Sequence, residues 1–316
     1  MRNTNPMKIL NNKIVKFVVK LIISLAFVAW LIFEIDWLQV WGYLKELSLV
    51  SIVLYVSVLL LGMMISAWKW KMLLAHKNIS ISLKKSFQLY LTGAFINNFM
   101  PSTIGGDTYR AYQIGKDSKR FSAVSSSVVF DRVTGLFAVI LLTGLIAIFQ
   151  WNEISKFAEL KLAVIAVLII MHAIIFFGIL TKLSFWKKIA GKFPKIVQDF
   201  AIELAHYKED GAYLKAIGIS ILFSVVGLGL VNWILFSGLG ITVGIWQYLS
   251  VIFLISIISA LPISINNIGL KEWAYVTFFG FFGVPASAVV AVALISRVLQ
   301  MIVSFTALPM YLRTKK

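Results

Sequence analysis

Cysteine is absent from the 316 residues, and only three histidines are present. The lack of cysteine excludes a disulfide framework, an iron–sulfur cluster and a thiol nucleophile, and three scattered histidines do not form a zinc-binding pattern. Charged residues make up only 14% of the chain, against about 25% in ordinary soluble domains. Hydrophobic residues make up 60%. These absences exclude a water-soluble enzyme and leave an all-α polytopic membrane protein.

The charge that is present is mostly basic, with a formal net charge of +17. The lysines and arginines lie in short flanks between apolar runs, as the positive-inside rule requires of a membrane protein. No basic stretch is long enough to form a nucleic-acid groove. The predicted partner of this charge is therefore an anionic lipid surface, and nucleic acid is excluded.

The apolar runs predict about six full transmembrane helices, since a span needs about 20 apolar residues. We expect them near residues 17–33, 49–67, 123–149, 162–181, 213–237 and 286–312. The loop at 34–46 is net acidic and is predicted outside, whereas Lys69 and Trp70 are assigned to a cytoplasmic flank and its interface. Both termini are then cytoplasmic, and the chain is one multi-pass domain of the cell membrane, covering residues 1–316.

The segment at 182–212 is polar and is predicted to be cytoplasmic. Apolar residues recur at helical spacing within it after Pro194. Two interpretations stay open at this stage, a short amphipathic helix on the inner interface and a solvated connector.

Two further apolar segments are too short to cross a membrane comfortably. Residues 86–100 end at Pro101, and their two flanks are both basic; residues 246–262 end at Pro262 and are followed by a second short arm at 273–282. We therefore predict two re-entrant hairpins, the first entered from the inside and the second from the outside. Broken backbone at membrane depth is tolerated only where it is buried in protein or lines a wet cavity.

These hairpins divide the chain into two similar units, repeat 1 at about 49–149 and repeat 2 at about 213–312. Pro101 precedes Arg132 by 31 residues, and Pro262 precedes Arg297 by 35. Two units of opposite orientation, each with a broken segment, are the sequence pattern of a transporter with its binding site near the membrane midplane. The sequence thus predicts an inverted-repeat arrangement.

Only six arginines occur, and Arg110, Arg132 and Arg297 lie in or beside apolar segments. An arginine at the centre of a span costs about 2.5–3.5 kcal/mol on insertion scales, so it faces a cavity or a partner. Arg132 and Arg297 are candidate bidentate ligands of a lipid phosphate. The alternative is that each forms an ion pair that only locks helices together.

The carboxylates of the same segments are the expected partners. Asp131 is adjacent to Arg132 and points elsewhere on a helix, so its partner is Arg110 or Arg297. Asp107 lies three residues before Arg110 and can share a helix face with it. Glu272 is predicted either to face a substrate or to stabilise a helix N-terminus. We expect all six charged groups to converge in one hydrated cavity between the hairpins.

The stretch from Asn98 to Arg110, NFMPSTIGGDTYR, is followed by Asp131–Arg132. It resembles the signature N-x-x-L-P-x-x-x-G-G-D-x-x-R, with D-R about twenty residues on, of the flippase-like membrane family that includes the transmembrane half of lysylphosphatidylglycerol synthases. Met100 stands where that motif has Leu. From Pro262 to Glu272 a second family motif, P-x-S-P-G-G-x-G-x-R-E, is matched in part; Asn266, Asn267 and Lys271 are among the departures. The candidate substrate-binding residues are Asn97, Asn98, Gly105, Gly106, Asp107, Arg110, Asp131, Arg132, Asn266, Asn267, Lys271, Glu272 and Arg297.

The resemblance implies movement of a lipid between leaflets, either an anionic or aminoacylated phospholipid or a polyprenyl-phosphate-linked sugar. Family members that make lysylphosphatidylglycerol carry a large soluble acyltransferase domain, and this sequence has no non-membrane stretch long enough for one. We therefore expect a transporter without a cofactor or metal, and not an enzyme. Two alternatives stay open: a membrane enzyme that modifies a lipid headgroup through Asp107, Asp131 or Glu272, and a non-transporting partner subunit of a glycosyltransferase.

Overall fold

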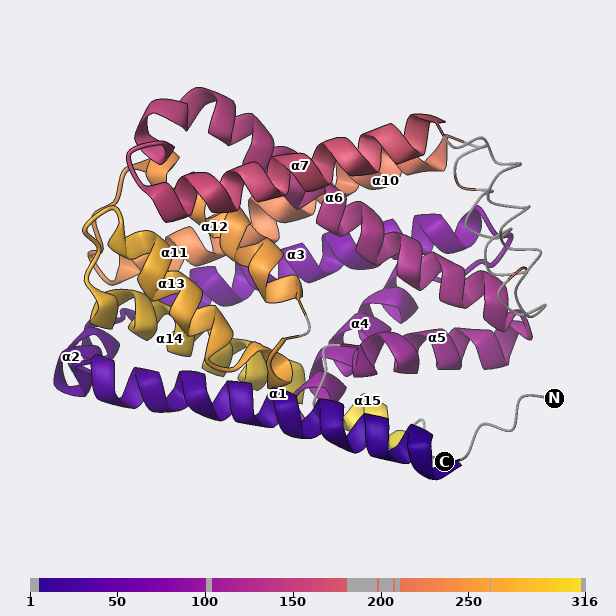
Figure 1. The fold of residues 1–316 in the computed structure, drawn as a ribbon. Coiled ribbons are helices and arrows are strands. Elements are labelled where there is room, and N and C mark those ends of the chain that lie inside the picture. Colours follow the sequence, from indigo (N-terminus) through magenta and orange to yellow (C-terminus); the bar gives the residue numbers. More distant parts are fainter. Residues whose placement is uncertain are drawn as a thin grey trace.

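The computed structural model describes residues 6–100, 104–180, 198, 207, 211–261 and 263–313 (Figure 1). Helices make up nearly all of these residues, and no strand occurs among them. The all-α prediction is therefore confirmed for the described chain. The elements are α1 (Pro6–Glu34), α2 (Trp37–Glu46), α3 (Leu49–Ala75), α4 (Leu83–Asn97), α5 (Gly105–Ser118), α6 (Phe121–Ile154), α7 (Ala158–Leu180), α10 (Ala212–Phe223), a π-helix η1 (Ser224–Leu230), α11 (Val231–Gly238), α12 (Ile245–Ala260), a 3-10 turn η2 (Ile265–Asn267), α13 (Leu270–Gly280), α14 (Ala286–Phe305) and α15 (Leu308–Arg313).

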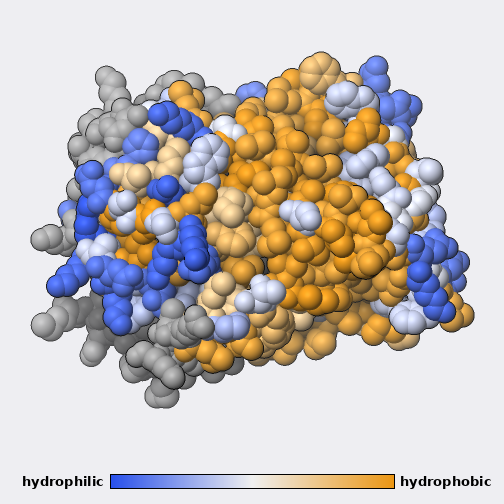
Figure 2. Space-filling view, turned by 180° about the vertical axis from the view of Figure 1, so that it is seen from behind, coloured by the Kyte–Doolittle hydropathy of each residue, from blue (hydrophilic) through white to orange (hydrophobic). Residues whose placement is uncertain are grey.

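Five stretches of the described chain are helical, long and apolar enough to cross a membrane: residues 17–34, 49–75, 121–154, 212–238 and 286–305. They coincide with five of the six predicted spans. The sixth corresponds to α7, which adjoins the undescribed residues 181–197, so the total of six stays a prediction. Figure 2 shows a broad apolar belt between hydrophilic groups at the two ends of the molecule, as a multi-pass protein requires.

The acidic segment at 34–46 was expected to be a loop, and this is wrong. It contains the helix α2, which begins after Asp36, whose carboxylate accepts hydrogen bonds from the backbone N–H groups of Leu38 and Gln39. Such an N-cap satisfies donors that a short helix would otherwise leave unpaired. Gln39 in turn accepts a hydrogen bond from Ser287 at the start of α14, so α2 packs on the same end of the molecule as the α13–α14 turn.

Helices α4–α5 and α12–α13 form two pairs that fold back midway along the molecule. In Figure 1 both turns lie toward the middle, and the open ends of the two pairs face opposite ends of the molecule. The folding back of each pair agrees with the sequence, whereas re-entry into a membrane and the inverted repeat stay predictions. Pro101 and Pro262, where the breaks were predicted, both lie outside the described residues.

Two glycines allow the helices of the first pair, α4 and α5, to approach each other closely. Gly93 of α4 packs against Gly106 of α5, where an added Cβ would lie 2.3 Å from the Gly93 carbonyl oxygen. The Oδ1 atom of Asn97 accepts a hydrogen bond from the Gly106 N–H at 2.7 Å. The first pair therefore fixes its own turn with groups from its own two arms.

The turn between α12 and α13 contains residues with positive φ angles and is hydrogen-bonded to a helix that is not part of the pair. Asn266, Asn267 and Gly269 have φ angles of 48°, 58° and 79°, which asparagine and glycine tolerate better than other residues. The backbone N–H of Ile265 donates to Ser24 Oγ of α1 at 2.8 Å. Helix α1 thus contributes a polar group to this turn from outside the pair.

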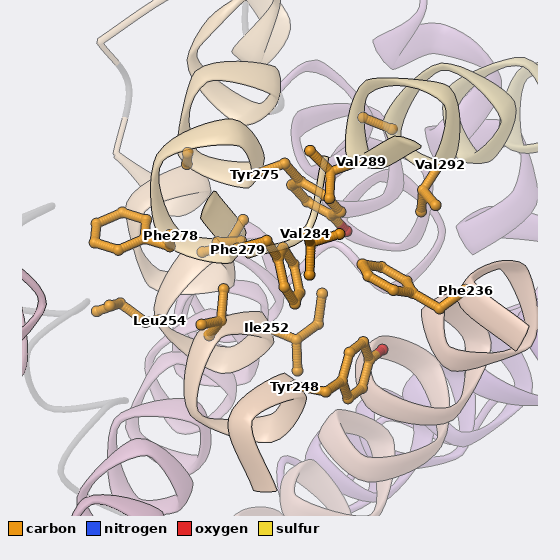
Figure 3. Packing of buried hydrophobic residues seen from close by; sticks show 14 of the residues in the cluster. Phe236, Tyr248, Ile252, Leu254, Tyr275, Phe278, Phe279, Val284, Val289 and Val292 are labelled. Carbon is orange, nitrogen blue, oxygen red and sulfur yellow. The ribbon is translucent and has the colours of Figure 1, made fainter. Parts of the chain in front are cut away.

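The largest group of buried apolar side chains lies around α11, α12, α13 and α14, and it extends to α6 (Figure 3). Phe236, Tyr248 and Phe279 are fully buried there and their rings contact one another. Because lipid tails are as apolar as these side chains, close packing rather than removal of water stabilises such contacts in a membrane. The second hairpin is thereby built into the packed interior.

The span at 212–238 is interrupted by the π-helix η1, which faces α3. A Cβ added to Gly62 of α3 would lie 2.9 Å from the Gly227 Cα in η1, so the two backbones approach as closely as glycine permits. π-Helical turns are rare and occur frequently at functional sites. The interfacial helix predicted within 182–212 lies almost wholly outside the described residues.

Candidate functional site

Asp131 of α6 is the centre of a buried network of ionic groups. Its side chain is 6% exposed, and its two oxygens contact groups from three other helices. Lys69 Nζ of α3 lies 2.9 Å from Oδ1, and Oδ2 accepts hydrogen bonds from Arg110 Nη2 of α5 at 2.8 Å and from the Tyr90 hydroxyl of α4 at 2.5 Å. The sequence predicted Arg110 as a possible partner of Asp131, and the structure confirms that pairing.

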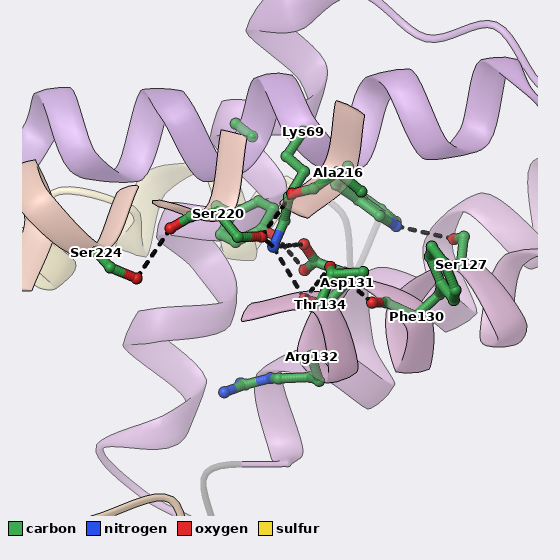
Figure 4. A network of polar contacts seen from close by, with 12 residues as sticks. Lys69, Ser127, Phe130, Asp131, Arg132, Thr134, Ala216, Ser220 and Ser224 are labelled. Carbon is green, nitrogen blue, oxygen red and sulfur yellow. Dashed lines mark hydrogen bonds and ion pairs between the residues drawn. The ribbon is translucent and has the colours of Figure 1, made fainter. Parts of the chain in front are cut away.

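The assignment of Lys69 to a cytoplasmic flank is wrong. Helix α3 continues to Ala75, and Lys69 is 4% exposed within it. Besides the ion pair with Asp131, its Nζ donates to the Asp131 carbonyl at 2.9 Å and to Ser220 Oγ of α10 at 2.8 Å (Figure 4). The ammonium group is buried because three oxygen atoms replace the water around it. Its sequence context, a lysine among tryptophans at the end of an apolar run, gave the opposite signal.

Trp70 was expected to be an interface anchor, and this is also wrong. Its side chain is fully buried and its indole N–H donates to Ser127 Oγ at 3.0 Å. The Arg110 guanidinium lies 4.8 Å from the centre of the Trp70 ring and 4.4 Å from that of Tyr90. Aromatic faces at these distances stabilise a desolvated cation. Trp70 is therefore part of the Arg110 binding environment.

Asp107 joins the two arginines of this network. Its Oδ1 accepts a hydrogen bond from Arg110 Nε at 3.1 Å, and its Oδ2 accepts one from Arg132 Nε at 2.7 Å. The predicted pairing of Asp107 with Arg110 on one helix face is thus confirmed. The Arg132 side chain is 57% exposed, against 3% for Arg110, and Figure 4 shows Arg132 pointing away from the Asp131 cluster.

We call Lys69, Asp107, Arg110, Asp131 and Arg132 the first network. It contains three cations and two carboxylates in continuous contact. With each group in its ordinary ionised state, the first network carries one uncompensated positive charge. Its chemistry therefore favours an anion.

A second network lies at the other hairpin. Glu272, in the first turn of α13, accepts a hydrogen bond from the Gly269 N–H at 2.8 Å through Oε2. Its Oε1 accepts one from Arg297 Nη2 of α14 at 2.9 Å. Of the two roles predicted for Glu272, stabilising the helix N-terminus is confirmed, and the same carboxylate also pairs with arginine.

Arg297 also contacts the turn itself. Its Nη1 donates to the Asn266 carbonyl at 3.3 Å and its Nη2 to the Asn267 carbonyl at 3.4 Å. Nearby, Lys271 Nζ donates to Ser296 Oγ of α14 at 3.1 Å. Asn266 and Asn267 thus contribute main-chain oxygens to this site. We call Glu272, Lys271 and Arg297, with these carbonyls, the second network.

Equal sequence spacing relates the two networks, and the sequence reasoning missed it. Asp107 and Arg132 are 25 residues apart, and so are Glu272 and Arg297. Each carboxylate lies in the first turn of a hairpin's second arm, and each arginine lies at a similar distance into the next helix. Alignment of the prolines gave unequal spacings, whereas alignment of the acidic residues would have revealed this signal.

The remaining candidate residues are at the first turn. Asn98 Nδ2 donates to Ser304 Oγ of α14 at 2.7 Å, which links the first hairpin to the helix that carries Arg297. Gly105 begins α5. Within the described chain, these ionic contacts form two networks that share no residue, so the single cavity expected from the sequence stays a prediction. The described residues contain no group of three histidine, aspartate or glutamate side chains placed to hold a metal ion.

Residues 17–307 match the family model described as lysylphosphatidylglycerol synthase TM region. The chain belongs to this family. It is 26% identical to the UPF0104 membrane protein MJ1595 of Methanocaldococcus jannaschii, with 92% of each chain covered. It is 21% identical to a UPF0104 membrane protein of Methanothermobacter thermautotrophicus, over 73% of this chain and 75% of that one. No solved structure matches the chain.

The resemblance read from the sequence motifs is thus confirmed as family membership. The region that matches the lysylphosphatidylglycerol synthase TM model includes both hairpins and every residue of the two networks. The family description and the apolar helices together identify a multi-pass membrane protein. The relatives' names give no substrate.

Proposed function

We propose that this protein moves a lipid with a phosphate-bearing headgroup between the leaflets of the cell membrane. The lipid is an anionic or aminoacylated phospholipid or a polyprenyl-phosphate-linked sugar. The protein acts as a transporter and not as an enzyme, without a cofactor. Membership of the lysylphosphatidylglycerol synthase TM family supports a lipid as the substrate, and the charged groups inside the apolar belt support a phosphate on it.

The observation that carries the proposal is the repeated carboxylate–arginine pair. Asp107–Arg132 and Glu272–Arg297 occur at equal spacing beside two helix pairs whose open ends face opposite ends of the molecule. Ionisable residues within membrane spans are costly and mark substrate pathways. Inverted repeats with broken helices near the midplane are a recurring architecture of transporters, with their binding sites at the repeat interface.

The proposed orientation places the end that holds the start of α1 and the end of α15 in the cytoplasm. The turns α3–α4 and α5–α6 lie at this same end (Figure 1), and they and their flanks contain Lys77, Lys84, Lys116 and Lys119. The opposite end, with α2 and the α6–α7 turn, is net acidic, with five acidic and three basic residues at 34–46 and 153–161. An excess of lysine and arginine on one side is the signal of the cytoplasmic face.

A leaflet-exchange assay in proteoliposomes tests the proposal. The purified chain is reconstituted with fluorescently labelled phosphatidylglycerol, lysylphosphatidylglycerol, phosphatidylcholine or a short polyprenyl phosphate, with and without a pH gradient. We expect faster exchange of at least one lipid than in protein-free liposomes. The Arg132→Lys variant, which keeps the charge but loses the planar guanidinium, should lose most of this exchange.

The same assay distinguishes the two other functions. If wild-type protein exchanges none of these lipids above the protein-free rate, the transport proposal fails. Mass spectrometry of lipids recovered from the liposomes would then detect a headgroup change made by a membrane enzyme. A chain that neither exchanges nor modifies lipid, but co-purifies with a glycosyltransferase, would instead be a partner subunit.

A further inference from the structure

The two carboxylates of the first network are held to very different extents. Asp131 is contacted by Lys69, Tyr90 and Arg110 from three helices, and its side chain is 6% exposed. The Asp107 side chain is 14% exposed, and its ion-pair partners in the first network are Arg110 and Arg132. Removing Asp131 would leave the buried Lys69 without its carboxylate and Arg110 with Asp107 alone, which is strongly destabilising. Asp131 is therefore a fixed part of the fold.

Asp107 can lose one partner and keep the other. It lies 3.0 Å from Arg110 Nη2 and 3.1 Å from Arg110 Nε, both through Oδ1, while Oδ2 contacts Arg132. If Arg132 moved to another anion, Asp107 would keep its contacts with Arg110. No buried charge would become unpaired by that exchange.

A further observation indicates that an anion belongs beside Asp107. Arg110 is 2% exposed, yet its Nη1 atom is buried without a hydrogen-bond partner. The other guanidinium nitrogens of Arg110, Nε and Nη2, contact Asp107. A buried donor without a partner thus belongs to the same guanidinium group that Asp107 contacts.

We propose that Asp107 is an internal competitor for Arg132, and that a lipid phosphate takes Arg132 from it on binding. This inference rests on the proposed function and names the group that sets affinity. Three cations, two carboxylates and one singly charged phosphate diester are neutral together, so the bound state needs no change of protonation. The 57% exposed Arg132 side chain is the part of the network that a headgroup can reach.

The second network lacks this freedom. Arg297 is held by Glu272 and by two backbone carbonyls of the turn, and its side chain is 24% exposed. Glu272 also caps α13 through Gly269. The same carboxylate-to-amide change is therefore expected to release a binding group at the first network only. Glu153→Gln, which alters an exposed ion pair outside both networks, is the matched control for Asp107→Asn.

Isothermal titration of the detergent-solubilised chain tests the inference. The probes are dioctanoyl phosphatidylglycerol, dioctanoylglycerol with the same tails but no phosphate, and sodium phosphate. We expect Asp107→Asn to bind dioctanoyl phosphatidylglycerol about tenfold more tightly than wild type, because the competing charge is gone. Glu153→Gln should stay within about twofold of wild type, and Arg132→Ala should lose binding. No variant should bind dioctanoylglycerol more tightly than wild type does.

Unchanged or weaker binding of dioctanoyl phosphatidylglycerol by a folded Asp107→Asn variant would overturn the inference, as would equally tighter binding by Glu153→Gln. Equal affinity of wild type for sodium phosphate and dioctanoyl phosphatidylglycerol would overturn a lipid as the ligand. If the proposed function were wrong but the inference right, the variants would show the expected affinities for dioctanoyl phosphatidylglycerol, yet no lipid would exchange between leaflets. Exchange with no effect of Asp107→Asn on affinity would refute the inference alone.

Discussion

The first and second networks contain the same pair of groups at the same separation of 25 residues, but in different surroundings. In the first, Asp107 bridges two arginines, and a separate buried carboxylate, Asp131, compensates the interior cations. In the second, Glu272 alone caps a helix and pairs with Arg297, which also bonds two turn carbonyls. One arginine is thus 57% exposed and the other 24%.

Two carboxylate–arginine pairs at the same sequence spacing can therefore have different roles. The spacing brings each arginine to the carboxylate of the preceding hairpin, but the additional contacts decide whether it can leave. Arg132 can exchange one anion for another, whereas Arg297 fixes the backbone of a turn with residues at positive φ, Asn266 and Asn267. The first network is suited to bind, and the second to fix the shape of the hairpin.

The largest expected effect is the side of the membrane from which each hairpin turn can be labelled, and the outcome for each turn is all-or-none. Ile104 and Ile268 are exposed residues beside the two turns, and the native chain has no cysteine. We expect Ile104→Cys to react with an impermeant maleimide only from the cytoplasmic side and Ile268→Cys only from the outside, in intact cells and inverted vesicles. The unmodified chain is the control. Reaction of both cysteines from one side would refute the inverted arrangement.

The next effect compares the two kinds of carboxylate within the first network. Asp131→Ala removes the carboxylate of the buried Lys69 and one of the two that Arg110 contacts, and breaking a buried ion pair in this way costs about 3–5 kcal/mol. We expect a large fall in the unfolding temperature in detergent, or no folded protein. Glu153→Ala breaks an exposed pair with Lys156 and should cost about 0–1 kcal/mol. Equal unfolding temperatures for the two variants would contradict the assigned role of Asp131.

The third effect separates the two arginines. Arg297→Lys leaves the partly buried turn carbonyls without their guanidinium donor, and each lost hydrogen bond costs about 0.5–1.5 kcal/mol. We expect lower thermal stability, with lipid exchange reduced only in proportion to folded protein. Arg132→Lys should keep nearly wild-type stability but lose most exchange.

Stability and exchange are measured on the same preparations of both variants. A stable Arg297→Lys variant without exchange would instead assign the phosphate to Arg297, as the sequence allowed. That outcome would make the two arginines equivalent in role as well as in spacing.

The smallest effect compares how the two turns are supported. Ser24 of α1 accepts from the Ile265 N–H, and Asn97 accepts from the Gly106 N–H within its own hairpin. Loss of either hydrogen bond in Ser24→Ala or Asn97→Ala should cost about 0.5–1.5 kcal/mol. Ser57→Ala, which removes a bond within one exposed helix turn, is the control. Proteolysis at residues 263–269 should accelerate only in Ser24→Ala, because α1 supports only that turn.

Much of the fold could be predicted from the sequence because hydropathy is local. Runs of about 20 apolar residues identify spans regardless of how they pack, and five such predictions coincide with helices of the structure. The short arms ending near Asn98 and Leu261 predicted where the chain folds back. The family, too, could be identified from sequence motifs, which include Gly105, Gly106 and Asp107.

The site was predictable only in part. Asp107–Arg110 follows from helical spacing, and Asp131–Arg110 from the need of each buried charge for a partner. Lys69 and Trp70 were misplaced because their sequence context is that of a membrane interface, whereas the packing of α3 against α6 and α10 buries both.

The sequence by itself thus determined the class of the protein, its apolar spans, the two breaks and the identity of the costly charges. Each of these depends on composition within a short window. Only the tertiary structure decided which charges meet, since Lys69 and Asp131 are 62 residues apart and Lys69 and Ser220 are 151 apart. It also decided that Arg132 is exposed and Arg297 is fixed, because exposure depends on neighbours from other helices rather than on a residue's own segment.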